Sequence, residues 1–550
     1  MIERWSVGWR PYALLALLCL GLYLPGLAAL PVIDRDEARF AQASRQMLES
    51  GDFLRIRFQD EARNKKPVGV YWLQSAAVAA LSTADSAAIW PYRLPSLLGA
   101  LAAALLTFAL GRALVGGAAA LLGAALLASA LGTVAEAHLA KTDALLLAAA
   151  VAAQTALGAI YRDGRRGGVA SRRWALLFWA AQGMAILIKG PVVPLLSLLA
   201  AGSLALADRD ARWLRGLHPL WGVPVMLAIA APWLVAITAA TGGAFLGEAV
   251  GHDFLGKLIG AQEAHGAWPG SYLLLLFLAF WPGSLLLAPA ASWAWEQRAA
   301  TPERFLIAWA VPFWLVLELV PTKLPNYLLP AYPALALLAA RASLALAEGR
   351  LMRRRWLERA GVVLFLLASL LLAAALVLVP ERFGHGLDLA GIAAAAIILF
   401  FGTRLALASL RRAGPGLAVR AALLALLVLP AGFALVAPGL DGLWLSREAA
   451  RMVARYHPPP AAPVVAVGYA EPSLVFLLGT ATRSLSPEDA AQYVTSARGA
   501  AALVSSGDDT AFRQALARRG WQARPVERTA GLDYSNGKAL MLTLYTGVPG

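Results

Sequence analysis

Charged residues are scarce in this chain. Asp, Glu, Lys and Arg make up 15% of its 550 residues, whereas hydrophobic residues make up 59%. A soluble domain usually carries about 25% charged residues, and the mean hydropathy here is +0.63. Apolar runs of roughly 20 residues recur along the chain, and this is the length that crosses the hydrocarbon core as a helix. The composition excludes a soluble globular protein and predicts an integral membrane protein.

Cysteine is almost absent. The one cysteine, Cys19, lies inside the first apolar run, which excludes a disulfide framework or a thiolate metal site within one chain. Basic residues outnumber acidic ones, and the formal net charge is +15. Most of the excess is arginine beside apolar runs, which the positive-inside rule explains. We therefore predict that the basic residues face a lipid bilayer, and we expect no nucleic-acid partner.

The apolar runs predict about thirteen membrane-spanning helices. A signal peptide is the alternative for the first run, but that run is long for one. The run at 68–81 is short for a span, and we interpret it as an interfacial or re-entrant helix on the outer side. With an inside N-terminus, this choice places all four arginine-rich loops inside. The predicted spans are 11–31, 92–113, 116–135, 143–161, 174–188, 190–207, 219–241, 271–291, 304–321, 324–344, 360–380, 389–409 and 417–437.

Lysine is rare, and on this topology every lysine lies on the outer face, whereas the inner loops use arginine. A compact ammonium group suits phosphate. We therefore expect at least two of these lysines to bind phosphate, the alternative being ordinary snorkelling at helix ends. They are Lys65, Lys66, Lys141, Lys189, Lys257, Lys323 and Lys538.

The sequence changes character near Asp441, where charges return and apolar runs shorten. We predict a transmembrane domain at 1–440, with a long outer loop at 32–91, and a small extramembrane α/β domain at 441–550 on the outer side. Because no Gly-rich phosphate loop occurs there, we interpret the second domain as a lid or accessory. Its patterns predict helices at 446–456, 487–498 and 510–519, and strands at 463–468, 501–505 and 539–545.

The first outer segment, 32–67, is too long for a plain connection. It predicts an amphipathic helix at 37–48, preceded by Asp34 and Asp36 and opened by Glu37. Such carboxylates can hold a divalent metal, or can cap the helix, with Asp36 as the N-cap. The basic stretch that ends in Lys65-Lys66-Pro67 follows nearby, which favours a functional site over capping.

Three more outer segments concentrate polar groups. In 136–143, Asp143 begins a span and is either a helix cap or a second site carboxylate. In 241–270, Glu263 and His265 are candidate ligands for a divalent metal, although their spacing is a poor zinc signature. In 321–327, prolines fix a turn that holds Lys323 and Tyr327 at the outer end of the bundle, or merely form a stiff hairpin.

Taken in order, these residues resemble a known family. The motifs are Asp36-Glu37-Ala38-Arg39-Phe40 after the first span, Lys66-Pro67 with Tyr71-Trp72 following, Asp143, and Lys323-Leu324-Pro325-x-Tyr327. The set resembles the bacterial 4-amino-4-deoxy-L-arabinose lipid A transferases, relatives of the protein O-mannosyltransferases with the GT-C fold. The resemblance covers the membrane part and also implies thirteen spans and a periplasmic C-terminal domain. The family usually has Glu-Lys-Pro where this chain has Lys65-Lys66-Pro67, so a metal or sugar-amine contact there is in doubt.

The resemblance implies transfer of an aminosugar from undecaprenyl phosphate to a lipid A phosphate on the periplasmic face of the bacterial inner membrane, giving polymyxin resistance. It implies no nucleotide sugar and no required cofactor, and we expect a monomer. Cations would offset the charge on the leaving phosphate, and carboxylates would stabilise the cationic anomeric carbon. The predicted catalytic residues are Asp36, Asp143 and Glu37, and the predicted substrate-binding residues are Arg39, Lys65, Lys66, Lys141, Lys189, Lys323 and Tyr327.

Other functions stay open. Within the enzyme class, the acceptor could be a protein or another surface glycan. A transporter would place ionisable pairs and broken helices near mid-membrane, and the predicted spans are nearly free of charge at their centres. A structural or sensor protein with a periplasmic domain is a further alternative.

Overall fold

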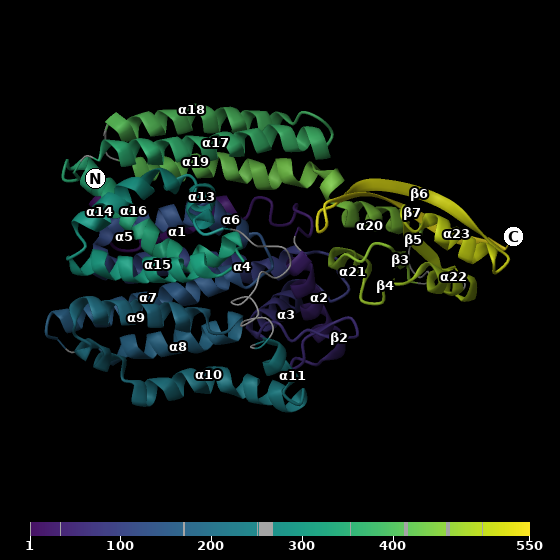
Figure 1. The fold of residues 1–550 in the computed structure, drawn as a ribbon, viewed down its shortest axis with the longest axis horizontal. Helices are drawn as coiled ribbons and strands as arrows, with labels where there is room; N and C mark the ends of the chain where they lie inside the picture. The colour runs from purple at the N-terminus through teal and green to yellow at the C-terminus, as the bar shows by residue number, and fades with distance from the viewer. Residues whose placement is uncertain are drawn as a thin grey trace.

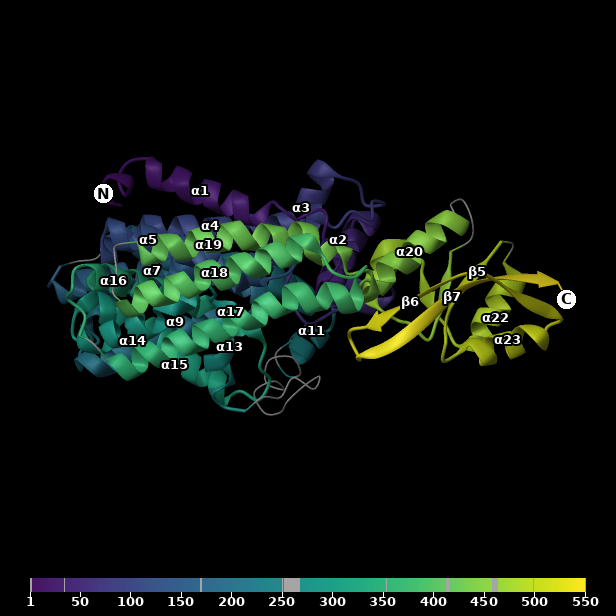
Figure 2. The same ribbon diagram turned by 90° about the horizontal axis from the view of Figure 1, so that it is seen from above.

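The computed structural model describes residues 2–33, 35–168, 171–249, 251, 268–352, 354–411, 416–457, 463–497 and 499–549. A long bundle of roughly parallel and antiparallel helices forms the N-terminal part (Figure 1). A smaller α/β domain packs against one end of this bundle, as the second view also shows (Figure 2).

Most of the bundle consists of apolar helices. Its elements are η1 (Ile2–Trp5), α1 (Arg10–Tyr23), α2 (Arg35–Ser50), β1 (Arg57–Phe58), β2 (Glu61–Ala62), α3 (Gly69–Leu81), α4 (Trp90–Val115), α5 (Gly117–Ser129), α6 (Leu131–Ala137), α7 (Asp143–Arg165), α8 (Arg172–Lys189), α9 (Val192–Asp208), η2 (Arg212–Leu217), α10 (Pro219–Ala240), α11 (Ala244–Leu246), α13 (Ser271–Ala279), η4 (Gly283–Leu286), α14 (Leu287–Glu296), α15 (Thr301–Leu319), η5 (Pro325–Ala331), α16 (Tyr332–Ala347), α17 (Arg355–Phe383), α18 (Leu389–Arg411), α19 (Leu417–Ala431) and the turns η6 (Gly432–Val436), η7 (Ala437–Gly439) and η8 (Asp441–Leu443).

Each predicted span overlaps at least one helix, although α1 covers only residues 10–23 of the first predicted span, 11–31. The count of thirteen spans stays a prediction. In the described part of the chain, seven helices are long and apolar enough to cross a membrane, or eight if α5 and α6 form one span bent by 62°. The span predicted at 271–291 is divided into α13, η4 and α14. The run at 68–81 forms the separate 13-residue helix α3. The chain is therefore a multi-pass membrane protein.

The two ends of the bundle differ in their charges. At one end, here called the arginine end, Arg162 donates to the Ala113 carbonyl and Arg341 to the Val115 carbonyl, where α4 finishes. At the other, the lysine end, Lys189 pairs with Asp143, where α7 begins. The α/β domain lies at the lysine end, and the N-terminus lies at the arginine end (Figure 1).

The C-terminal domain is one mixed sheet with helices on its faces. The strand order is β4-β3-β5-β7-β6, in which β3 runs parallel to β4 and β5, and β7 is antiparallel to β5 and β6. The predicted strands and helices all appear, whereas α21, β4 and β6 were not foreseen. The elements are α20 (Leu445–Tyr456), β3 (Val465–Val467), α21 (Pro472–Leu478), β4 (Arg483–Ser484), α22 (Pro487–Ser496), β5 (Ala501–Ser505), α23 (Asp509–Ala517), β6 (Trp521–Asp533) and β7 (Lys538–Pro549).

The C-terminal domain docks on α2 through α21. The Phe476 ring is fully buried in an apolar cluster with Val32, Ala38 and Tyr92. Arg45 is 2% exposed, donates to the Phe476 carbonyl at 2.6 Å and stacks on the Phe476 ring. Since α2 also carries Asp36, this interface fixes the helix that presents the candidate site.

Candidate functional site

Asp36 lies in the first turn of α2 at the lysine end, where a helix dipole favours a carboxylate. Its side chain is 55% exposed, although it sits beside two arginines. The Asp36 Oδ1 atom is 3.7 Å from an Arg63 Nη2 atom and 3.8 Å from an Arg39 Nη1 atom. A carboxylate that is this exposed and flanked by cations can meet a substrate.

The electrostatics favour an ionised Asp36. Desolvation by the surrounding protein opposes the charge, but the positive charges of Arg63, Lys141, Arg39 and Lys66 outweigh it and hold the pKa of the Asp36 carboxyl below its ordinary value. The basic stretch after β2 and the loop before α7 therefore act on the same carboxylate. The sequence motifs that are far apart along the chain converge here.

Arg63 is a member of this group that sequence reasoning did not select. Its Nε donates to the Tyr71 hydroxyl at 3.3 Å, and its guanidinium stacks on the Phe40 ring. These contacts join α2 to α3 and hold the arginine beside Asp36. Arg63 opens the basic stretch that contains Lys66, which is the signal that could have identified it.

Glu37 occupies a different environment from its neighbour. Its side chain is fully buried and forms a bidentate pair with the fully buried Arg93, at 2.8 and 2.9 Å. It also accepts from the backbone amides of Ile33 and Ala140. Arg93 donates in addition to the Leu27, Leu30 and Pro31 carbonyls. This arrangement favours a structural role for Glu37, and the catalytic role that the sequence suggests for it stays a prediction.

A second charged assembly forms where three helical segments meet. Asp143, at the start of α7, is 4% exposed and accepts from the Lys189 Nζ at 2.5 Å. Lys189 ends α8, and its ammonium lies 5.4 Å from the centre of the Tyr327 ring in η5. The predicted residues Asp143, Lys189 and Tyr327 are therefore neighbours.

Lys141 connects the two assemblies. Its Nζ lies 3.6 Å from the Glu136 Oε1, and its charge acts on both Asp36 and Asp143. Ser96 of α4 donates to the Lys141 carbonyl at 3.1 Å and so fixes the loop that carries it. Both candidate carboxylates therefore belong to one region of the lysine end.

The other lysines differ in their surroundings. Lys66 is partly buried, whereas the adjacent Lys65 is exposed. The Lys323 ammonium donates to the Glu318 and Val320 carbonyls at 3.0 and 2.7 Å, so it caps the end of α15. This local role favours the hairpin interpretation of the 321–327 segment over phosphate binding by Lys323.

No group of three or more His, Cys, Asp and Glu side chains that could hold a metal occurs among the described residues. The candidate ligands Glu263 and His265, and also Lys257 and Asp34, lie outside those residues. His138, the histidine of the 136–143 segment, is fully buried and bonded through both ring nitrogens to backbone carbonyls. The metal prediction therefore stays a prediction.

Comparison with known proteins agrees with the sequence motifs. A family model described as dolichyl-phosphate-mannose-protein mannosyltransferase matches residues 11–241. The undecaprenyl phosphate-alpha-4-amino-4-deoxy-L-arabinose arabinosyl transferase of Pseudomonas paraeruginosa is 31% identical over 379 residues, which are 67% of this chain and 65% of that protein. The transferase of the same name from Pectobacterium carotovorum is 27% identical over 62% of this chain and 60% of its own length. The chain thus matches just under two thirds of these relatives' length.

Solved structures extend the likeness over the whole fold. The crystal structure of ArnT from Cupriavidus metallidurans bound to undecaprenyl phosphate has a TM-score of 0.75 at 22% identity and covers 97% of both chains. The archaeal oligosaccharyltransferase AglB from Archaeoglobus fulgidus has a TM-score of 0.53 at 12% identity, over 92% of this chain and 70% of its own. The family model, the relatives and the solved structures agree: the chain is similar to the undecaprenyl phosphate-alpha-4-amino-4-deoxy-L-arabinose arabinosyl transferases over nearly two thirds of their length, and it has the fold of ArnT.

Proposed function

We propose that this protein is a glycosyltransferase that moves 4-amino-4-deoxy-L-arabinose from undecaprenyl phosphate to a phosphate of lipid A. The accessible Asp36 carboxylate, with four cationic side chains acting on it at one end of a membrane bundle, carries the proposal. A lipid-linked phosphosugar needs cations at the membrane surface for its phosphate and a carboxylate near its anomeric carbon. The relatives' names specify the sugar and the lipid carrier.

In the proposed reaction, the bond between the anomeric carbon and the undecaprenyl phosphate oxygen breaks, and a lipid A phosphate oxygen forms the new bond. Lys66, Arg63 and Arg39 offset the charge that develops on the leaving phosphate. Asp36 stabilises the cationic anomeric carbon. The acceptor phosphate is already anionic, so no strong general base is required.

We assign a positioning role to Asp143. Its carboxylate is nearly buried and holds Lys189, whose ammonium also faces the Tyr327 ring. A lysine fixed in this way can bind a phosphate oxygen with a small loss of side-chain entropy. The direct contact with the sugar that the sequence suggests for Asp143 is then unnecessary.

The proposal includes an orientation in the bacterial inner membrane. Thirteen crossings would put the arginine end in the cytoplasm by the positive-inside rule, and the lysine end with the C-terminal domain in the periplasm. Labelling of single cysteines by a membrane-impermeant reagent tests this orientation, because a variant lacking Cys19 supplies a cysteine-free background. A cysteine at the exposed position 50 should react in intact cells, whereas one at the exposed position 298 should not.

We further propose that the enzyme acts as a monomer, needs no cofactor and confers polymyxin resistance. Mass spectrometry of lipid A from cells with and without the gene tests the function. The proposal predicts species that carry one or two added aminopentose units only when the protein is present. Lipid A of unchanged mass together with a newly glycosylated protein would favour the second candidate, a protein glycosyltransferase, which the match to the mannosyltransferase model supports.

A further inference from the structure

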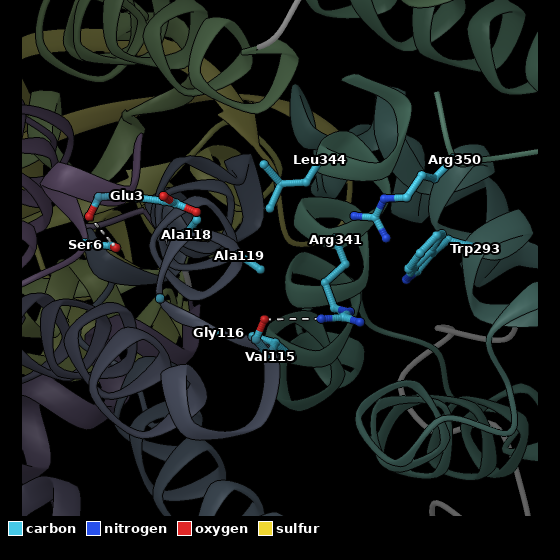
Figure 3. Close-up of a pocket in the computed structure, with 11 residues that line it drawn as sticks. Glu3, Ser6, Val115, Gly116, Ala118, Ala119, Trp293, Arg341, Leu344 and Arg350 are labelled. Carbon is cyan, nitrogen blue, oxygen red and sulfur yellow. Dashed lines mark hydrogen bonds between the residues drawn. The ribbon is translucent and has the colours of Figure 1, made fainter. Parts of the chain in front are cut away.

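A polar cavity lies at the arginine end of the bundle. It has a volume of about 310 Å³, and its lining includes Glu3, Ser6, Trp293, Arg341 and Arg350 (Figure 3). It also borders the end of α4, whose other end packs near Glu37. At about 1.5 Å per residue, the 26-residue α4 separates the two regions by roughly 40 Å. The cavity is therefore independent of the candidate active site.

Two arginines form one wall of the cavity. Figure 3 shows the Arg341 and Arg350 side chains beside the Trp293 ring, whose centre lies 5.8 and 5.6 Å from the two guanidinium carbons. Arg341 pairs with the fully buried Glu303 through Nε and donates to the Val115 carbonyl through Nη1. Within the described chain, no group accepts from its Nη2. In the described part of the chain, the ion-pair partner of Arg350 is the exposed Glu348. Guanidinium donors are thus available for an anion.

The opposite wall adds further groups that suit a phosphate ester. Helix α5 begins at Gly117, so the positive end of its dipole borders the cavity. Glu3 is the acidic residue of the lining, on the η1 side and next to Ala118 in Figure 3. The wall therefore offers an acceptor for an ammonium or hydroxyl group across from the arginines. A phosphodiester that carries such a donor matches both walls.

Exposed tryptophans show the depth of the cavity in the membrane. Trp5 and Trp9 precede α1, Trp295 lies at the end of α14 and Trp356 at the start of α17, and each is at least half exposed. Tryptophan gathers at the level of the lipid headgroups, and basic pockets between helices on the cytoplasmic side bind phospholipid headgroups. The ligand that fits this position is a lipid rather than a soluble metabolite.

We propose that this cavity binds the headgroup of a phospholipid of the inner leaflet, with the phosphate at Arg341 and Arg350 and the headgroup's ammonium or hydroxyl donor at Glu3. Phosphatidylethanolamine and phosphatidylglycerol both have this chemistry. Phosphatidylcholine has the phosphate but no donor. The inference goes beyond the proposed function, since it needs neither the sugar donor nor the acceptor.

Native mass spectrometry of the delipidated full-length protein in detergent, with each of the three lipids added, tests the inference. Arg350→Gln is the informative variant, because Arg341 is needed by the buried Glu303. Arg359→Gln removes the same charge from an exposed position at the same end, outside the cavity lining. We expect Arg350→Gln to weaken binding of phosphatidylethanolamine and phosphatidylglycerol about tenfold, and Arg359→Gln to leave it unchanged.

Several results would overturn the inference. Equal losses of lipid binding in the two variants would assign the effect to general surface charge. No loss of lipid binding in either variant would show that the cavity is not the binding site. Equal binding of phosphatidylcholine would eliminate the role of Glu3. Competition by inorganic phosphate at a concentration equal to the lipid would assign the cavity to free phosphate. Since lipid binding is measured without sugar transfer, failure of the proposed function would leave this test intact.

Discussion

Replacing Arg93 with Met should destabilise the protein strongly. The guanidinium donates five hydrogen bonds, to both Glu37 oxygens and to the Leu27, Leu30 and Pro31 carbonyls. Both members of the ion pair are fully buried. Removing one partner of a buried pair leaves an uncompensated charge, which costs about 3–5 kcal/mol. The loss would also free the loop before α2 and therefore disturb the adjacent Asp36.

The assay is thermal unfolding in detergent, followed by tryptophan fluorescence. Arg55→Met is the matched control, because Arg55 pairs with Asp52 at 3.4 Å with both side chains partly exposed, and such a pair contributes about 1 kcal/mol or less. The double variant Glu37→Leu with Arg93→Met should lose less stability than the sum of the two single variants. If Arg93→Met and Arg55→Met unfold at the same temperature, the structural role assigned to the buried pair is wrong.

Three further predictions concern the site and its support. In a titration with undecaprenyl phosphate, Lys66→Ala should weaken binding about tenfold or more, whereas Lys65→Ala, on the exposed neighbour, should change it by less than about threefold. Equal effects of the two substitutions would contradict the assignment of Lys66 to the donor phosphate. Because the pKa of Asp36 is lowered, its carboxylate stays charged as the pH falls through about 4, the ordinary pKa of an aspartate. The rate of sugar transfer should therefore decline only below that pH. A decline centred near pH 6 would contradict a role for Asp36 alone. Arg45→Met should detach the C-terminal domain from α2, seen as faster proteolysis between the two domains, and unchanged cleavage would show that the apolar contacts suffice.

Much of the helical framework is predictable from the sequence, because long apolar runs determine where helices form. The breaks within it are less predictable. The bend between α5 and α6 follows Ser129, and the interruption of the 271–291 run coincides with Trp281-Pro282. Hydropathy averages over such short polar or proline-containing turns. The strand β6 was missed because its side chains are mostly part-exposed and lack a clear alternation.

The candidate site shows the same limit. Asp36, Lys66 and Asp143 stand out in sequence because charges are rare among apolar runs. The different environments of Asp36 and Glu37 cannot be predicted from the sequence. Glu37 is paired with Arg93, which lies 56 residues further along the chain. Lys323 and Lys189 look alike in sequence, but one caps its own helix and the other reaches a carboxylate on another helix. Only the packing of the helices separates these roles.

The most direct test of the central claim is transfer of the aminosugar from undecaprenyl phosphate to lipid A by the purified protein. Asp36→Asn should fold normally and lose at least about a hundredfold in turnover, as expected for loss of one electrostatic stabiliser of the transition state. Asp85→Asn, on an exposed position of the same outer loop, should retain wild-type turnover. Near wild-type transfer by Asp36→Asn would contradict the account.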